Sequence, residues 1–300
     1  MVGGDRQLLK LHKNDRAHNE IAAPVVKVSE FQHVAYMKRS RLLLLAVAFL
    51  GCSQEKPARE LRVCADPNNL PFSNQREEGF ENRLADLIAR DLGATVKYTW
   101  RPQRRGFIRN TLGAGLCDVI MGMPSGAERV LTTRPYYRST YVFVYRKDRQ
   151  LAIRSLDDPK LKQLKIGVQL IGDDYANTPP VHALSRRGIV GNLVGFTVFG
   201  DYSQENPPAR IIEAVVAGQV DIALAWGPLA GYFAGRSGAD LAVIPVSPAS
   251  DPPALKFSFD IGLAVRQDAA ALRDELQAVL VRREPEIRRL LAEYGVPLVS

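Results

Sequence analysis

Short apolar strands alternate with amphipathic helical segments from about residue 60 to the end of the chain, and this alternation constrains the fold more than any other feature. Such an order is typical of layered α/β domains in which most neighbouring strands are parallel. The spacing of apolar residues predicts strands at 61–65, 95–100, 118–122, 141–145, 164–168, 195–199, 221–225, 241–244 and 257–265, and helices at 80–92, 107–112, 206–216, 268–281 and 285–294.

A repeated sequence pattern indicates that the chain forms two similar lobes. The segments 114–119 and 217–222 share the pattern Ala-Gly-x-x-Asp-[Val/Ile], 103 positions apart, and Leu61-Arg-Val63 matches Leu164-Lys-Ile166 at the same offset. The boundary falls in the polar stretch 147–162, and the last long strand would lead back to the first lobe. We therefore expect lobe 1 to comprise 60–147 and 256–300, lobe 2 to comprise 148–255, and two hinge crossovers to join them.

The N-terminal region carries the pattern of an export signal. Three basic residues within 37–41 precede nine apolar residues, Leu42–Leu50, which are too few to span a bilayer. We expect 37–52 to be a signal peptide. Residues 1–36 are either not part of the natural protein, with Met37 as the true start, or a cytosolic extension. Gly51-Cys52 resembles a lipobox, so Cys52 is a lipidation candidate, with plain secretion as the alternative. Either route predicts a periplasmic protein, soluble or lipid-anchored.

Composition and charge disfavour several classes of function. The net charge is +8, but residues 52–300 hold 32 Lys/Arg and 28 Asp/Glu, without the basic block that tracks a phosphate backbone. Beyond the first 36 residues only His182 remains, so neither a His-based metal site nor a Ser/His/Asp triad can be assembled. Glycine spacings typical of nucleotide loops are absent. We expect no nucleic-acid binding, no metal, no cofactor and no enzymatic activity.

Several phrases resemble a known family of binding proteins. Segments 61–73 and 118–137 resemble the bacterial extracellular solute-binding proteins of the amino-acid-receptor type, family 3. Within that family, 64–74, 122–125, 130–144 and 226–231 resemble the MoxJ/XoxJ type, which is associated with quinoprotein methanol or alcohol dehydrogenases. The resemblance implies a type II periplasmic-binding-protein fold: two α/β lobes, each a mostly parallel sheet flanked by helices, with the binding cleft between them.

The resemblance also assigns candidate residues to the cleft. Arg129 matches the arginine that binds a ligand carboxylate, while Asn69 stands where the receptors place a stacking aromatic. Trp226 occupies the stretch where an acid usually meets the ligand's ammonium. Cleft candidates are Asp66, Asn68, Asn69, Ser125, Arg129, Tyr136 and Trp226. The alternatives are turn residues for Asp66 and Asn68, a surface ion pair for Arg129, and a core position for Trp226.

Cys64 and Cys117 form a candidate disulfide. They are the pair that remains if Cys52 is lipidated or removed, and an even pair in an oxidising compartment favours a bridge. In the implied fold they belong to neighbouring strands, where they could lie at opposite ends. The sequence leaves the geometry open.

These features favour one function over two others. The first is an accessory protein that binds a quinoprotein dehydrogenase, or an assembly intermediate of it, and assists its maturation or activation. The alternatives are a receptor that delivers a small carboxylated solute or amino acid to an ABC transporter, and an enzyme on the same fold, such as a dehydratase. Met123, Tyr137 and Trp226 favour the first, since an apolar cleft suits a protein segment better than a zwitterion.

Overall fold

The computed structural model of the protein describes residues 59–170, 177–197 and 202–300. Its longer strands are β1 (Arg59–Ala65), β4 (Ala94–Trp100), β5 (Val119–Pro124), β7 (Tyr137–Arg146), β8 (Ile166–Leu170), β9 (Leu193–Thr197), β10 (Ile222–Trp226), β11 (Leu241–Pro245) and β14 (Ser258–Val265). Two-residue strands are β2 (Asn68–Asn69), β3 (Ser73–Asn74), β6 (Leu131–Thr132), β12 (Ser250–Asp251) and β13 (Leu255–Lys256).

The α-helices are α1 (Phe80–Leu92), α2 (Phe107–Asn110), α3 (Pro179–Arg186), α4 (Arg210–Val216), α5 (Gly227–Arg236), α6 (Ala270–Arg282) and α7 (Glu284–Glu293), with short 3-10 turns at Lys147–Arg149, Pro159–Lys162 and Pro207–Ala209. Within the described residues, no helix is both long enough and apolar enough to cross a bilayer. The predicted extension, the signal peptide and Cys52 lie outside these residues.

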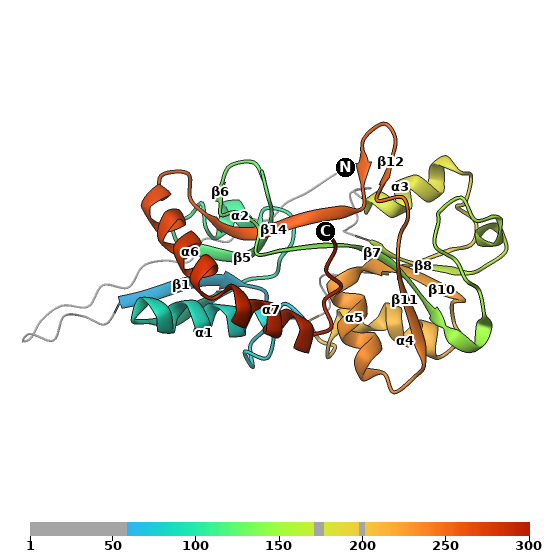
Figure 1. Ribbon diagram of the computed structural model, residues 1–300, viewed down its shortest axis with the longest axis horizontal. Helices are drawn as coiled ribbons and strands as arrows, with labels where there is room; N and C mark the ends of the chain where they lie inside the picture. Colours follow the sequence, from blue (N-terminus) through green and yellow to red (C-terminus); the bar gives the residue numbers. More distant parts are fainter. Residues whose placement is uncertain (1–58, 171–176, 198–201) are drawn as a thin grey trace, which may run out of the picture. The chain divides into compact units, whose positions relative to one another are not determined.

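The main sheet places parallel strands on either side of two antiparallel crossover strands (Figure 1). Its order is β4-β1-β5-β14-β7-β10-β8-β9, with β6 beside β14 and β11 beside β7. Strand β1 pairs in parallel with both β4 and β5, and β8 pairs in parallel with both β9 and β10. Strands β7 and β14 pair with each other and connect the two groups. The predicted α/β fold with two lobes and two crossovers is confirmed.

Helix α1 packs one lobe's core because its apolar residues recur every four positions. Phe80, Leu84 and Ile88 are fully buried, and they join residues of β1, β5, β14, α6 and α7 in one cluster. Gly93 ends the helix in the left-handed conformation, with φ of 60°, and its N–H bonds back to the helix. Phe143, Ile166 and Leu224 belong to a separate cluster in the other lobe.

The structure differs from the predicted helices at α4 and α5, and helix α3 was not expected either. Helix α4 begins at Arg210 rather than at Asn206, because Asn206 has φ of 48° and leads into a 3-10 turn, where its side chain caps nothing. Helix α5 was not expected, since three glycines weaken its intrinsic helix propensity. Two of them are required by packing: a Cβ on Gly227 would lie 2.5 Å from the Thr140 carbonyl oxygen, and one on Gly231 would lie 1.9 Å from that of Gly295.

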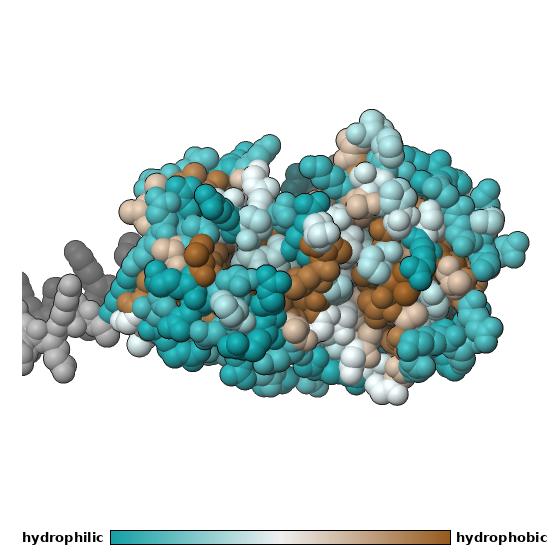
Figure 2. Space-filling view, in the orientation of Figure 1, coloured by the Kyte–Doolittle hydropathy of each residue, from teal (hydrophilic) through white to brown (hydrophobic). Residues whose placement is uncertain are grey.

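The surface seen in Figure 2 is mainly hydrophilic. Apolar side chains gather on this face between α5 and α7 and over β11 (Figure 2). Leu241, Val243, Gly231 and Pro297 are among the residues that line a shallow hollow there. Strand β11 pairs with β7 along one side, and no second partner is recorded for it among the described residues.

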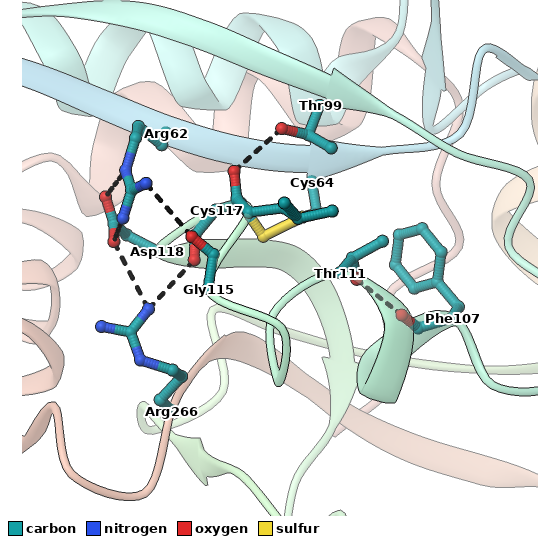
Figure 3. The surroundings of a disulfide bond; sticks show 10 residues. Arg62, Cys64, Thr99, Phe107, Thr111, Gly115, Cys117, Asp118 and Arg266 are labelled. Carbon is teal, nitrogen blue, oxygen red and sulfur yellow. Dashed lines mark hydrogen bonds and ion pairs between the residues drawn. A yellow bond between two sulfur atoms is a disulfide. The ribbon is translucent and has the colours of Figure 1, made fainter.

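Cys64 and Cys117 form a disulfide, which confirms their predicted pairing (Figure 3). Their Cα atoms are 5.5 Å apart although Cys117 precedes β5. Just before that strand the chain contacts first β4 and then β1: the Leu116 carbonyl accepts a hydrogen bond from Thr99 Oγ1, and the Asp118 N–H donates to the Arg62 carbonyl. The approach to β5 therefore carries Cys117 over β1, so the two sulfurs meet despite the parallel register.

Candidate functional site

A cavity of about 370 Å³ lies where the ends of the parallel strands meet the two crossover strands. Asn69, Phe72, Glu81 and Gln103 line it together with residues of β5, while Gln169, Trp226 and Leu229 line it from the other lobe. Residues of β7 and β14 complete the wall. The remaining lining residues are Gly122, Pro124, Tyr137, Tyr141, Thr178, Pro179, Phe259 and Ile261. Open α/β sheets bind ligands at the carboxyl ends of their strands, and this cavity occupies such a position.

Aromatic rings form much of the cavity wall. Trp226 lies edge-to-face with Tyr141 and with Phe259, at centroid separations of 5.3 and 5.9 Å. The position of Trp226 is fixed by its backbone N–H, which donates to Gln169 Oε1 at 2.6 Å. Phe72 and Tyr137 supply two more rings. Edge-to-face contacts leave ring faces available for an apolar or cationic guest.

A hydrogen-bonded polar cluster lies beside this aromatic wall. Buried Asp66 accepts from the backbone N–H groups of Asn68 and Gln103 and from the Tyr202 hydroxyl, at 2.8, 2.7 and 2.8 Å. Gln103 Oε1 accepts a longer bond from Asn69 Nδ2, at 3.3 Å. Asp66 thus positions the backbone of the cavity-lining Gln103 and connects the first lobe to Tyr202 of the second.

Glu81 is the one ionisable carboxyl among the described lining residues. It stands in the first turn of α1, and its carboxyl lies against Gly122, where a Cβ would come within 2.0 Å of Oε1. Glycine at position 122 therefore makes room for this carboxyl. Burial raises the pKa of Glu81 to about 8, and the negative charge of Asp66 adds to the rise. At neutral pH the carboxyl is mostly protonated.

Two tyrosines adjoin Glu81 at the start of β7. Tyr136 donates its hydroxyl proton to the Met121 carbonyl at 3.1 Å, and Tyr137 lines the cavity. Burial raises the pKa of each well above its ordinary value, and Glu81 contributes to the rise in both cases. Both hydroxyls stay protonated and neutral, so they serve as hydrogen-bonding groups rather than as charges.

The structure brings two of the seven predicted cleft residues, Asn69 and Trp226, to the cavity wall. Asn68 instead lines a neighbouring polar hollow, where its Nδ2 donates to the Gln204 carbonyl at 2.8 Å. Asp66 and Tyr136 are not among the lining residues and act through the hydrogen bonds given above. Ser125 and Arg129 are exposed and lie outside the lining.

Sequence reasoning missed Glu81, Gln103, Gln169, Tyr141 and Phe259. Tyr141 and Phe259 lay inside predicted strands, where a core position was the simplest interpretation. Glu81 followed a buried Phe80 at a helix start, where an acidic residue is ordinary. A single signal could have found it: Gly122 interrupts an apolar strand, as a glycine does where another group approaches the backbone closely. Among the described residues, no group of three or more His, Cys, Asp or Glu could hold a metal ion.

Comparison with known proteins places the chain in a family. The model of the bacterial extracellular solute-binding proteins, family 3, matches residues 61–296, so the chain belongs to that family. Within it the chain is similar to proteins of the MoxJ and XoxJ type, as its sequence phrases predicted. Protein MoxJ of Methylorubrum extorquens AM1 is 34% identical over 250 residues, covering 81% of this chain and 82% of the relative.

Two further matches agree with that resemblance. Protein MoxJ of Paracoccus denitrificans is 29% identical over 254 residues, covering 80% of this chain and 89% of the relative. The crystal structure of the periplasmic binding protein XoxJ from Methylobacterium extorquens AM1 matches with 35% identity and a TM-score of 0.66, covering 80% of this chain and 99% of that one. The predicted family and its two-lobed α/β fold are thereby confirmed.

Proposed function

We propose that this protein is a periplasmic accessory protein that binds a pyrroloquinoline-quinone-dependent methanol or alcohol dehydrogenase, or an assembly intermediate of it, and assists its maturation or activation. The observation that carries the proposal is the character of the cavity, in a chain similar to MoxJ and XoxJ proteins. Its walls are largely apolar and include five aromatic side chains, and no Lys, Arg or His is found among the described residues that line it.

A free amino acid fits this cavity poorly. Its carboxylate needs a cation or a cluster of donors, because burying an unpaired charge costs several kcal/mol. Arg129, the residue that matches the carboxylate-binding arginine of the receptors, is exposed and stands apart from the lining. The same argument disfavours any small carboxylated solute at this position.

A segment of a partner protein fits better. Trp226, Tyr141 and Phe259 present rings that can cover an apolar side chain, and aromatic residues are the ones enriched at the centres of protein interfaces. The cavity of about 370 Å³ has room for one or two large side chains from a docked helix or strand. Binding by this route needs no cofactor and no catalytic group.

The test uses two variants in the native host. The gene is deleted, and dehydrogenase activity is compared after complementation with wild-type protein, Trp226→Ala and Arg129→Ala. We expect loss of dehydrogenase activity on deletion, poor rescue by Trp226→Ala and full rescue by Arg129→Ala. Tagged wild-type protein should co-purify with the dehydrogenase and Trp226→Ala should not, while thermal melting of each variant controls for folding.

A transport receptor would give the opposite pattern. Dehydrogenase activity would survive deletion, no dehydrogenase would co-purify, and calorimetry would show tight binding of an amino acid that Arg129→Ala abolishes. That combination would overturn the proposal in favour of a receptor for an ABC transporter.

A further inference from the structure

The single acid in the cavity lining bears on which guest the cavity binds. Five aromatic side chains line it, and the carboxyl of Glu81 is the one ionisable acid beside them in the described lining. Rings present negative π-faces, so a box of rings with one acid attracts positive charge. A purely apolar guest would leave the acid unused, and a carboxylate guest would find no Lys, Arg or His among the described lining residues to pair with.

Two acceptors in this lining lack donors. Asn69 is 4% exposed, and its Oδ1 is buried without a hydrogen-bond partner. No hydrogen bond or ion pair is found for the Glu81 side chain within the described parts of the chain, although its carboxyl rests against Gly122. A buried acceptor without a donor, such as Asn69 Oδ1, is rare in folded proteins because the unpaired group destabilises the fold. A guest rich in N–H donors would satisfy them.

We propose that this cavity binds an alkylammonium group: Glu81 takes the positive head, Asn69 Oδ1 accepts one of its N–H bonds, and the rings of Tyr141, Trp226 and Phe259 enclose the alkyl stem. The guest carries no carboxylate, which separates it from the zwitterions that amino-acid receptors bind. Glu81, in the first lobe, is also not at the second-lobe position where such receptors place their acid.

Binding is expected to release a proton. Unliganded Glu81 holds its proton at pH 7, since its pKa is about 8. The groups that face it are Asp66 after β1, Tyr98 of β4, Tyr136 just before β7 and Tyr137 of β7, while β5 offers only Gly122. The tyrosines stay neutral and Asp66 keeps its three donors. A bound cation would therefore favour the ionised carboxyl, and Glu81 would release its proton on binding at pH 7.

The alkylammonium group could come from a free amine or from a lysine side chain of a partner, and the second source rests on the proposed function. Trp226 and Glu81 stand on opposite lobes, so either guest would bridge them. Both sources have the same ammonium head group and the same kind of alkyl stem. They differ in whether the stem is attached to a peptide backbone.

The test compares three probes that differ mainly in charge: n-butylammonium, butyramide and butyrate. Calorimetry on the full mature protein at pH 7, in buffers of different ionisation enthalpy, gives affinity and proton release together. We expect n-butylammonium to bind about tenfold more tightly than butyramide and with measurable proton release, and butyrate not to bind. Equal affinity for butyramide, or binding without proton release, would overturn the proposal.

Variants assign the effect to the carboxyl. Glu81→Gln should weaken n-butylammonium binding about tenfold and abolish the proton release, while butyramide binding changes less than about threefold. Gly122→Ala should act in the same direction, because its Cβ takes the space of Oε1. Glu213→Gln, an exposed acid on α4, is the matched control and should change nothing. Unaltered n-butylammonium binding by a folded Glu81→Gln protein would refute the assignment.

A last comparison separates the two sources. A lysine peptide with free termini blocked is tested beside the same peptide with its lysine acetylated. Tighter binding of the lysine peptide than of n-butylammonium assigns the site to a partner, and weaker binding assigns it to a free amine. If dehydrogenase co-purification fails while n-butylammonium still binds, the proposed function falls and this inference stands.

Discussion

Removing the Cys64–Cys117 disulfide should cost this protein a large part of its stability. The bridge joins residues 53 positions apart, and closing a loop of that length lowers the entropy of the unfolded chain by an amount worth about 4 kcal/mol. Native domains are stable by only about 5–15 kcal/mol, so the change is readily measured. For a chain of this size, a loss of that magnitude lowers the melting temperature by about 10 °C.

The double variant Cys64→Ala/Cys117→Ala isolates the bridge. Both cysteines are buried beside Leu112 and Ile120, so alanine keeps the site apolar and removes little more than two sulfur atoms. Thermal melting and urea denaturation are followed by circular dichroism on the mature protein, with and without a thiol reductant. Reductant should destabilise the wild-type protein to nearly the level of the variant, and should leave the variant unchanged.

The bridge acts mainly on the unfolded chain, so the variant should keep its native near-ultraviolet spectrum at 20 °C. A loss below about 1 kcal/mol, or a wild-type protein insensitive to reductant during unfolding, would refute the reasoning. So would two titratable thiols, beyond any from Cys52, in denatured protein that was never reduced.

Three further predictions concern stability. Leu84→Ala, at a fully buried position of α1, should cost about 3 kcal/mol in urea denaturation because it leaves a cavity. Gly231→Ala should cost about 1–3 kcal/mol, since its Cβ would lie 1.9 Å from the Gly295 carbonyl oxygen. The pKa of Asp118 is lowered, first by its hydrogen bond to Arg62, so its stabilisation is present above the ordinary carboxyl pKa and is lost as pH falls through the lower, folded value. Asp118→Asn should flatten the stability profile of the protein below about pH 5.

The prediction for Gly231 has a control variant in the same helix, and the other two have outcomes that would contradict them. Gly235→Ala lies in the same helix with open space around its Cβ, and it should be neutral or slightly stabilising. If it destabilises as much as the variant at Gly231, close approach is not the cause. An Asp118→Asn protein with an unchanged acid profile would show that the titration of Asp118 does not contribute to stability against acid. A loss below about 1 kcal/mol for Leu84→Ala would mean that the core collapses around the gap.

The fold was predictable because its signals are local and repeated. The spacing of Phe80, Leu84 and Ile88 predicts α1, and each of these residues is fully buried. The shared offset of 103 positions predicts two similar lobes, and parallel strands of β1 and β8 stand on the two sides of the crossover pair. Helix α5 escaped prediction because tertiary packing, through Gly227 and Gly231, overrides its weak propensity.

The site was harder to predict because its residues come together only in three dimensions. Trp226 and Asn69 were selected from positions that family members use, and both reach the cavity. Arg129 was selected by the same reasoning and is exposed, because a matching residue type does not fix where the backbone after β5 carries its side chain. Resemblance to the family thus identified some positions in the cleft. Which chemical groups line the cleft could be seen only from the three-dimensional structure.

The acid of this cavity illustrates the difference. The family resemblance implies an acid in the second lobe of amino-acid receptors, where this chain has Trp226-Gly-Pro, and Asp66 of the first lobe was the one acid among the predicted cleft residues. The structure instead provides Glu81 from the first lobe, beside a glycine that accommodates it. Trp226 then faces a cavity that holds an acid and has no described cation in its lining. Amino-acid receptors pair an arginine with the ligand carboxylate and an acid with the ligand ammonium. Here the described lining has no arginine, and its acid stands in the first lobe instead of the second. Such a cleft suits a cation that carries no carboxylate, such as a lysine side chain or a simple amine.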